Sequence, residues 1–200
     1  MDCNSRASPR ERIMEASREL FAAKGFHSAP MAELAAAAQV SVGQIYRHFP
    51  CKDDIIVGIA EEDAHENLNI LEAIFESTER GDLSPSQAIE MFANNALTRA
   101  NEALSLEILA ESYRNQRVSE TIHLLSTRYR DLVRRLTSRA RPDLNDLDLE
   151  ACVEIMTACF YGLGLRTSTR TGLDPTTLSR AAACLIIRGL ESAKPREPAS

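Results

Sequence analysis

Two short helical segments separated by a tight turn constrain the N-terminal part of this chain most strongly. The first spans about residues 30–38, and the second follows Ser41 and runs to about His48. Ser41 is a suitable N-cap because its hydroxyl can accept a hydrogen bond from a backbone amide, and Pro50 then breaks the segment. Two short helices joined in this way, the second started by a cap, predict a helix-turn-helix.

A longer amphipathic helix is predicted before this unit. Ser8 can cap it, Pro9 suits its first position, and Glu11 completes a capping box. Apolar residues then recur at helical spacing until Gly25, which is the residue expected in the left-handed conformation that ends a helix. The first 52 residues are therefore predicted to form a three-helix domain.

The rest of the chain also has helical periodicity, and no strand pattern of period two longer than a few residues interrupts it. Helices are predicted over residues 52–79, 85–101, 102–114, 119–139, 146–170 and 175–192. The expected fold is all-α with about nine helices, divided into residues 1–52, a larger helical domain at 53–194, and a Pro-rich tail at 195–200 that is predicted to be disordered.

Charge limits how the chain could bind nucleic acid. The net charge is −6 and the pI is about 5.3, which argues against a protein that simply coats DNA or RNA. Residues 1–60 carry seven basic and seven acidic side chains, so the excess of acid lies in the remainder. Any affinity of the N-terminal domain for DNA must come from a few well-placed groups.

Other compositional features predict a cytoplasmic protein. The five cysteines form no CxxC motif or Cys/His cluster, which indicates free thiols in a reducing compartment. No stretch approaches 18 apolar residues, and the N-terminus lacks an apolar signal segment, so the chain is expected to be soluble and to have no membrane partner.

The N-terminal residues carry a family resemblance. The segments FAAKGF at 21–26, MAELA at 31–35 and VSVGQIYRHF at 40–49, followed by Lys52, resemble the TetR/AcrR family of transcriptional repressors. The likeness covers roughly residues 10–63, and its spacing holds without a gap. It departs from the family at Gln39, where glycine is usual, and at Ala29 or Pro30, where a capping threonine is usual. Gln39 is expected to accept the turn at some cost in strain.

The resemblance implies a DNA-binding surface on the second short helix. Val42, Gly43 and Gln44 would lie against base edges in the major groove, where glycine allows close approach and glutamine can pair with adenine. The other positions would contact or support contacts with phosphates, and Arg47 could instead read guanine. The full set of implied DNA-binding residues is Ser41, Val42, Gly43, Gln44, Tyr46, Arg47, His48 and Lys52.

The resemblance also implies that residues 53–194 bind an effector and form a homodimer through the last two long helices. These helices carry small residues beside apolar ones, which permits close helix packing, although packing within one chain would explain them too. The middle helices would enclose a largely apolar small-molecule site, and the same residues could equally be core. Its candidates are Phe75, Met91, Phe92, Asn95, Tyr113, Tyr129, Met156, Cys159 and Phe160. Tyr113 and Tyr129 are favoured because they would bring polar ends into that interior.

The functional prediction is a regulator, most consistent with a repressor released from a palindromic operator by a small, largely apolar ligand. Two alternatives stay open: a helical module that binds protein and not DNA, and an enzyme with a helical fold. No catalytic constellation, phosphate loop or metal-ligand spacing supports an enzyme, so no catalytic residue, cofactor or metal is predicted. The effector, the operator sequence, the regulated genes and the sign of regulation are not encoded in recognisable motifs.

Overall fold

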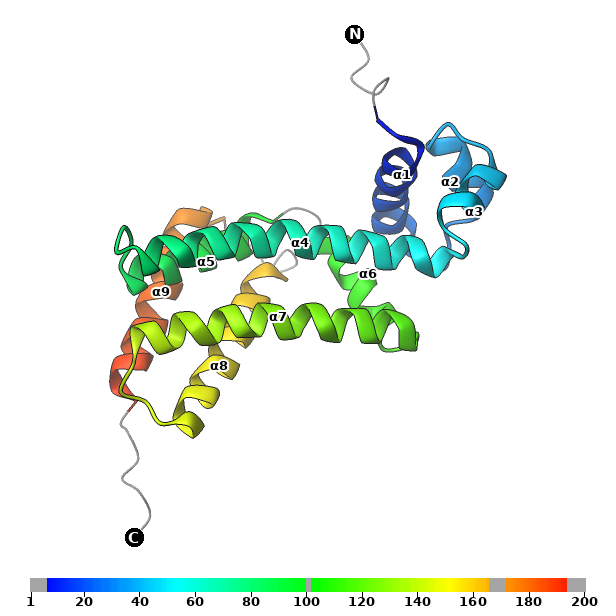
Figure 1. The fold of residues 1–200 in the computed structure, drawn as a ribbon. Coiled ribbons are helices and arrows are strands. Elements are labelled where there is room, and N and C mark those ends of the chain that lie inside the picture. Colours follow the sequence, from blue (N-terminus) through cyan, green and yellow to red (C-terminus); the bar gives the residue numbers. More distant parts are fainter. Residues whose placement is uncertain (1–6, 100–101, 166–171, 194–200) are drawn as a thin grey trace. The chain divides into compact units, whose positions relative to one another are not determined.

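The computed structural model describes residues 7–99, 102–165 and 172–193, and within these ranges it contains nine α-helices and no strand (Figure 1). The helices are α1 (Pro9–Lys24), α2 (Met31–Ala37), α3 (Val42–His48), α4 (Lys52–Glu79), α5 (Pro85–Thr98), α6 (Glu102–Ser112), α7 (Gln116–Ala140), α8 (Asp146–Gly164) and α9 (Pro175–Ser192). The predicted all-α fold with about nine helices is confirmed.

The capping box predicted for α1 is present. The Ser8 hydroxyl accepts a hydrogen bond from the Glu11 amide at 3.3 Å, and the Glu11 carboxylate accepts one from the Ser8 amide at 2.8 Å. At the other end Gly25 has φ +83°, and its amide donates to the Phe21 carbonyl at 2.9 Å. A side chain at position 25 would be strained at this angle, so glycine is required there.

The turn between α2 and α3 has the strain that the sequence predicted. Gln39 has φ +55°, and it is the one non-glycine residue with a positive φ in the part of the chain that the structure describes. An L-residue pays a steric cost in this left-handed region, where glycine would not. Pro30 directly precedes α2 as its N-cap and makes no side-chain capping hydrogen bond, so the helix begins at Met31, one residue later than predicted.

Several predicted helix ends shift by a few residues. Helix α5 ends at Thr98 rather than 101, because Arg99 adopts an extended conformation. Helix α7 begins at Gln116 rather than 119, because the Asn115 side-chain oxygen accepts from the backbone amides of Arg117 and Val118 at 3.1 and 3.4 Å. Helix α8 ends at Gly164, and most of the predicted extension to residue 170 lies outside the described residues.

The chain forms two compact units, of which the first combines residues 1–65 and 103–125. Its core joins Ile13, Phe21, Leu34 and Ile45 of the three-helix domain to Ile55 of α4, all fully buried. The predicted division at residue 52 therefore differs from the compact unit, which continues well into α4. The apolar side chains at the start of α4 are part of the core on which α1, α2 and α3 pack.

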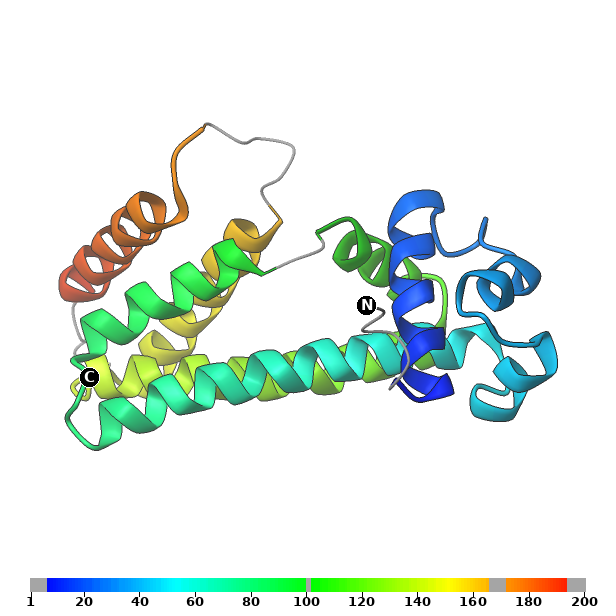
Figure 2. The same ribbon diagram turned by 90° about the horizontal axis from the view of Figure 1, so that it is seen from above.

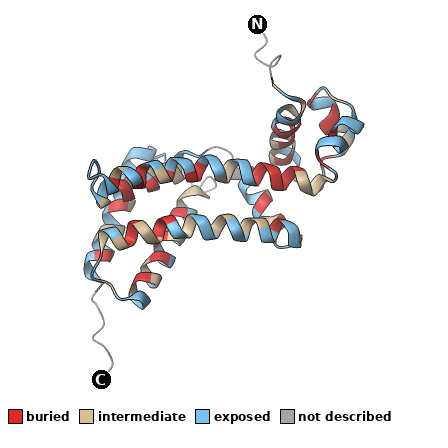
Figure 3. Ribbon diagram, viewed as in Figure 1, coloured by how far each residue is buried: buried red, intermediate tan, exposed pale blue. Residues whose placement is uncertain are grey.

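The second unit combines residues 66–102 and 126–200. Its core draws buried apolar residues from α4, α5, α7, α8 and α9, and α5 packs against both α8 and α9 (Figure 2). Within this unit the buried residues of α4 and α7 recur at helical spacing, at positions 67, 68, 71, 74, 75 and 78 and at positions 132, 133, 136 and 137 (Figure 3). Among the described residues, no helix is both long enough and apolar enough to cross a membrane.

Candidate DNA interface and effector site

Helix α3 buries one side chain in the core, and its other side chains lie on the surface. Ile45 is fully buried, and it is the only buried residue of this helix. Tyr46 is 49% exposed and Val42 36% exposed. The predicted contact residues of α3 and its cap are all exposed: Ser41, Val42, Gly43, Gln44, Tyr46, Arg47 and His48. The structure thus brings seven of the eight predicted DNA-binding residues onto one short, accessible segment.

A reciprocal capping box fixes the start of α3. The Ser41 hydroxyl accepts from the Gln44 amide at 3.1 Å, while the Gln44 side-chain oxygen accepts from the Ser41 amide at 2.9 Å. The Gln44 side-chain nitrogen remains available as a donor. A two-point contact with adenine requires both ends of the carboxamide, so the oxygen that accepts from the Ser41 amide would also have to accept from the base.

The glycine at position 43 is not required by the fold. Gly43 lies in helical backbone, and a Cβ atom built on it would meet only the Ser41 hydroxyl, at 3.9 Å. Alanine would fit there without strain and would favour the helix. Because glycine has no side chain, the backbone of α3 is uncovered at this position, and another molecule can approach it closely.

The ammonium group of Lys52, expected to contact a phosphate, is bound to backbone carbonyls of its own unit. It donates to the Phe26 carbonyl, lies 3.5 Å from the His27 carbonyl, and sits 5.7 Å from the centre of the Phe21 ring. Burial lowers the pKa of Lys52, although Asp53 acts in the opposite direction. In this conformation Lys52 ties the start of α4 to the turn after α1, and a phosphate contact would require those hydrogen bonds to break.

Two cations of the three-helix domain are already paired with carboxylates. The Arg18 guanidinium binds Glu62 at 2.6 Å and also pairs with Asp63, and Lys24 pairs with Glu33. Arg47 has no ion-pair partner among the described residues, and it lies on the exposed face of α3. The positive charge available to DNA at this surface is therefore small and local.

The predicted effector residues divide between core and surface. Phe75, Phe92, Met156 and Phe160 are buried in the core of the second unit, where the Phe92 and Phe160 rings lie 5.9 Å apart. Met91 is 42% exposed, and Cys159 is exposed. Met91 and Cys159 were predicted from the helical spacing of apolar residues, but both lie on the solvent-exposed sides of their helices.

Polar groups accompany this apolar core. The Asn95 side-chain amide donates to the Asn67 side-chain oxygen at 2.6 Å. The Tyr129 and Tyr161 rings lie 5.3 Å apart, and burial raises the pKa of the Tyr129 phenol. Tyr129 is thus half-buried among the helices of the second unit, as expected.

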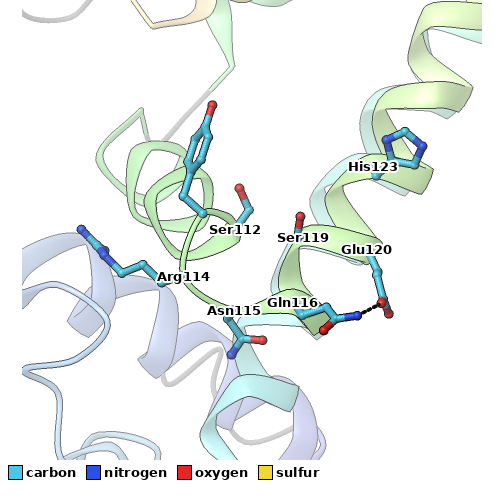
Figure 4. A pocket seen from close by; sticks show the side chains of 8 residues that line it. Ser112, Arg114, Asn115, Gln116, Ser119, Glu120 and His123 are labelled. Atoms are coloured by element: carbon cyan, nitrogen blue, oxygen red, sulfur yellow. Dashed lines mark hydrogen bonds between the residues drawn. The ribbon is translucent and has the colours of Figure 1, made fainter.

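The expectation for Tyr113 is wrong. Its side chain is 85% exposed and belongs to the first unit, in the turn that follows α6. It lies past the end of the apolar pattern, so its phenol extends into solvent. It lines an open pocket of about 550 Å³ at the α6–α7 corner, together with Ser112, Arg114, Asn115, Gln116, Ser119, Glu120 and His123 (Figure 4). This pocket contains none of the other predicted effector residues.

Helices α8 and α9 each expose a stripe of apolar and small residues. On α8, Ile155 is 66% exposed, and Ala158 and Gly162 are exposed on the same face. On α9, Leu185 is 73% exposed and lies close to exposed Gly189. A Cβ atom at either glycine would meet nothing within 4 Å. Phe160 and Ala183 of the same two helices are instead buried in the core of the second unit.

Sequence reasoning missed the polar residues of α6 and of the turn after it that contact the three-helix domain and the start of α4. Glu107 accepts a hydrogen bond from the Phe26 amide across 81 residues of sequence, and Asn115 donates to Asp53 across 62. Such contacts have no local signal, because nothing in the neighbouring residues indicates a partner so distant in the chain. Within the described residues no cluster of three or more potential metal ligands is present.

Comparison with known proteins places these features in a family. Residues 13–59 match the family model for bacterial regulatory proteins of the tetR family. The HTH-type transcriptional regulator UidR of Escherichia coli K12 is 32% identical over 110 residues, which are 55% of this chain and 55% of UidR. The aligned part therefore spans just over half the length of that relative.

Solved structures extend the likeness over most of the chain. Salmonella enterica GusR superposes with a TM-score of 0.69 at 25% identity, covering 90% of this chain and 95% of GusR. A putative transcriptional regulator from Pseudomonas aeruginosa PAO1 gives a TM-score of 0.82 at 18% identity, covering 95% of both chains, which shows a common fold. The family and UidR are regulators and not enzymes, in line with the prediction from the sequence. The chain is therefore similar to the TetR family of bacterial regulatory proteins, in sequence over residues 13–59 and in fold over most of its length.

Proposed function

We propose that the protein is a DNA-binding transcriptional regulator, most consistent with a repressor, which binds a palindromic operator as a homodimer and is released by a small ligand. The observation that carries this proposal is the exposure of α3. A helix of seven residues keeps only Ile45 in the core and presents glycine, glutamine, tyrosine, arginine and histidine outward. That arrangement suits a helix that enters the major groove.

The outward residues have different roles in this proposal. Val42, Gly43 and Gln44 lie in the first turn, which meets base edges in a helix-turn-helix, so they select the sequence. Tyr46 and His48 donate to phosphates and set the register of the protein on the duplex, and Ser41 can do the same. Arg47 can bind guanine or phosphate. Lys52 contributes through the position of α4, unless DNA draws its ammonium outward.

Dimerisation follows from the small contact surface of one domain. A single module of this kind buries about 600–1,000 Å² on DNA, and the cations available near α3 are few. Two copies joined in a dimer would place two recognition helices in successive major grooves, roughly 34–36 Å apart. The exposed stripes of α8 and α9 support this assembly, because Ile155 and Leu185 would be buried against a second copy and the glycines would let the helices approach closely.

The effector site of this proposal lies in the second unit. Its core offers an apolar lining with a few polar groups, namely the Asn67–Asn95 pair and Tyr129, whose ring lies 5.3 Å from that of the more exposed Tyr161. A ligand with an apolar body and one or two hydrogen-bonding groups suits such a lining. Release requires that this ligand bind more tightly to a conformation in which the DNA-binding helices are out of register.

The test is a titration of purified protein with duplex DNA from the region upstream of its own gene, at moderate salt, with a scrambled duplex of the same length as control. Protection of two half-sites about one helical turn apart is expected, with affinity that falls as salt rises. No binding, or equal binding to the scrambled duplex, would reject the proposal. Either result would favour the alternative in which this helical domain binds a protein.

A further inference from the structure

Two carboxylates from α6 lie against the turn before α2, and one of them, Glu107, accepts a backbone hydrogen bond from it. The Phe26 amide donates to Glu107 Oε2 at 2.9 Å, and one helical turn later Glu111 Oε2 lies 2.8 Å from His27 Nε2. Glu111 is only 4% exposed. Glu107 also lies 3.4 Å from where a Cβ of Gly25 would be, so the glycine allows the carboxylate to approach the turn.

The start of α4 is held by two residues that follow α6. The Asn115 side-chain amide donates to Asp53 at 2.7 Å, and the Arg117 guanidinium forms an ion pair with Asp54. The same Asp54 carboxylate accepts a hydrogen bond from the Cys51 amide at 2.9 Å. The backbone just after α3 is thereby tied to the first turn of α7.

These contacts lie at both ends of the helix-turn-helix. The α1–α2 turn leads into α2, and residues 51–54 lead out of α3. None of the hydrogen bonds or ion pairs that the four side chains form in the described part of the chain involves a residue of α3. Apolar packing supports the same joint, because Leu104, Ile108 and Val118 belong to the core of the first unit.

We propose that Glu107, Glu111, Asn115 and Arg117 form a clamp that positions the helix-turn-helix for operator binding without touching DNA. The clamp rests on the proposed DNA-binding function, and Glu107 is its principal positioning residue. It stabilises one orientation of α2 and α3 against the alternatives that a short loop on each side would allow. Weakening it lowers the fraction of molecules that are ready to bind, and the apparent affinity falls by the same factor.

The experiment compares Glu107→Ala with Glu107→Gln in the full-length protein. Alanine removes the acceptor of the Phe26 amide, whereas the glutamine side-chain oxygen can still accept that hydrogen bond. Operator affinity is expected to fall about tenfold in E107A if one molecule in ten remains competent, and to recover in E107Q. The loss should be the same at every salt concentration, because the phosphate contacts in the complex are unchanged.

A matched control is available on α7. Glu120 is exposed and accepts a hydrogen bond from Gln116 at 2.9 Å, within its own helix. Glu120→Ala removes a carboxylate from the same corner of the molecule but leaves the clamp intact, so operator affinity should not change. Equal losses in E120A and E107A would overturn the proposal, since they would reflect the charge of the corner and not the hydrogen bond.

Hydrogen exchange separates the clamp from the DNA-binding function. The Phe26 amide should exchange faster in E107A than in the wild type or in E107Q, with or without DNA. Unchanged exchange at Phe26, or full operator affinity in E107A, would overturn the clamp while leaving the proposed function intact. A wild type that binds no DNA would reject the proposed function, and the exchange measurement would still decide whether Glu107 holds the turn.

A second variant covers the case in which E107A does not fold. The Arg117 side chain is 58% exposed, so Arg117→Ala removes the hold on Asp54 with little effect on the core. A smaller loss of operator affinity, again independent of salt, is expected. Wild-type affinity in R117A would then contradict the clamp.

Discussion

Helix α3 and the apolar centre of the second unit use their side chains in opposite ways. In α3 the fold needs Ile45 and leaves the rest of the helix to function. In the second unit the candidate effector residues Phe92, Met156 and Phe160 are also the residues that hold the helices together. A surface whose residues are not required by the fold can be assigned a function from its pattern, whereas a binding site built from core residues cannot be distinguished from core.

The largest expected effect is the loss of stability on replacing a buried residue of the second unit. Phe160 is 1% exposed and packs against Phe92, so Phe160→Ala should lower the free energy of unfolding by about 3–5 kcal/mol through lost burial and a cavity. Urea unfolding measures it. A loss below 1 kcal/mol would mean that the side chain faces an open site and is not core, which would break the contrast in favour of a preformed effector pocket.

The next largest expected effect is a loss of operator affinity with no change in the free energy of unfolding. Arg47→Ala should weaken operator binding by about 1–3 kcal/mol if the guanidinium contacts a base or a phosphate. The free energy of unfolding should change by less than roughly 0.5 kcal/mol, because Arg47 is exposed and makes no ion pair among the described residues. Anisotropy titration and urea unfolding of one preparation test both. A variant that loses stability but keeps its affinity would reverse the assignment of this face.

Lys52 lies between the two cases, since the resemblance implies a phosphate contact while the structure turns the ammonium toward the Phe26 carbonyl. Lys52→Met keeps the apolar stem and removes the donor. The protein should lose about 1 kcal/mol of stability, while the slope of log affinity against log salt stays as in the wild type. A slope shallower by about one would show that the ammonium reaches a phosphate in the complex.

The smallest expected effect is a dependence on pH at the start of α4. Burial raises the pKa of Asp54, but hydrogen bonds from Cys51 and the Arg117 charge outweigh it, so the pKa lies below its ordinary value of 3.8. A depressed carboxylate pKa stabilises the folded state above pH 3.8, and that stabilisation is lost as the pH falls through the folded-state pKa.

The matched variant is Asp54→Asn. Its stability should be lower than that of the wild type at pH 6 by about 1 kcal/mol or less, because Arg117 is largely exposed to solvent. The difference should shrink below pH 3.8. A difference that stays constant down to pH 3 would show that the carboxylate charge is not what stabilises this turn.

The fold could be predicted from the sequence wherever local chemistry decides it. Ser8 and Ser41 cap helices, Gly25 ends one, and Gln39 takes a strained turn, each for a reason visible within a few residues. The domain division could not, because Ile55 belongs by sequence to a long helix and only packing joins it to the core of the first unit.

The candidate site was also predicted only in part. The exposed residues of α3 were identified by a motif without gaps, and the structure places them together. Tyr113 was misplaced because an apolar pattern does not show where a helix leaves the core. The clamp was missed because Glu107 and Phe26 are 81 residues apart, and a glutamate on a helix ordinarily indicates only a residue exposed to solvent.

The most direct test of the central claim, that the exposed face of α3 binds DNA, is the operator affinity of Tyr46→Ala measured beside its free energy of unfolding. Tyr46 is 49% exposed, and the fold does not depend on it. The account predicts an affinity lower by about tenfold or more, a loss of roughly 1–3 kcal/mol, with the unfolding free energy within about 0.5 kcal/mol of the wild type. Wild-type affinity in this variant would contradict it.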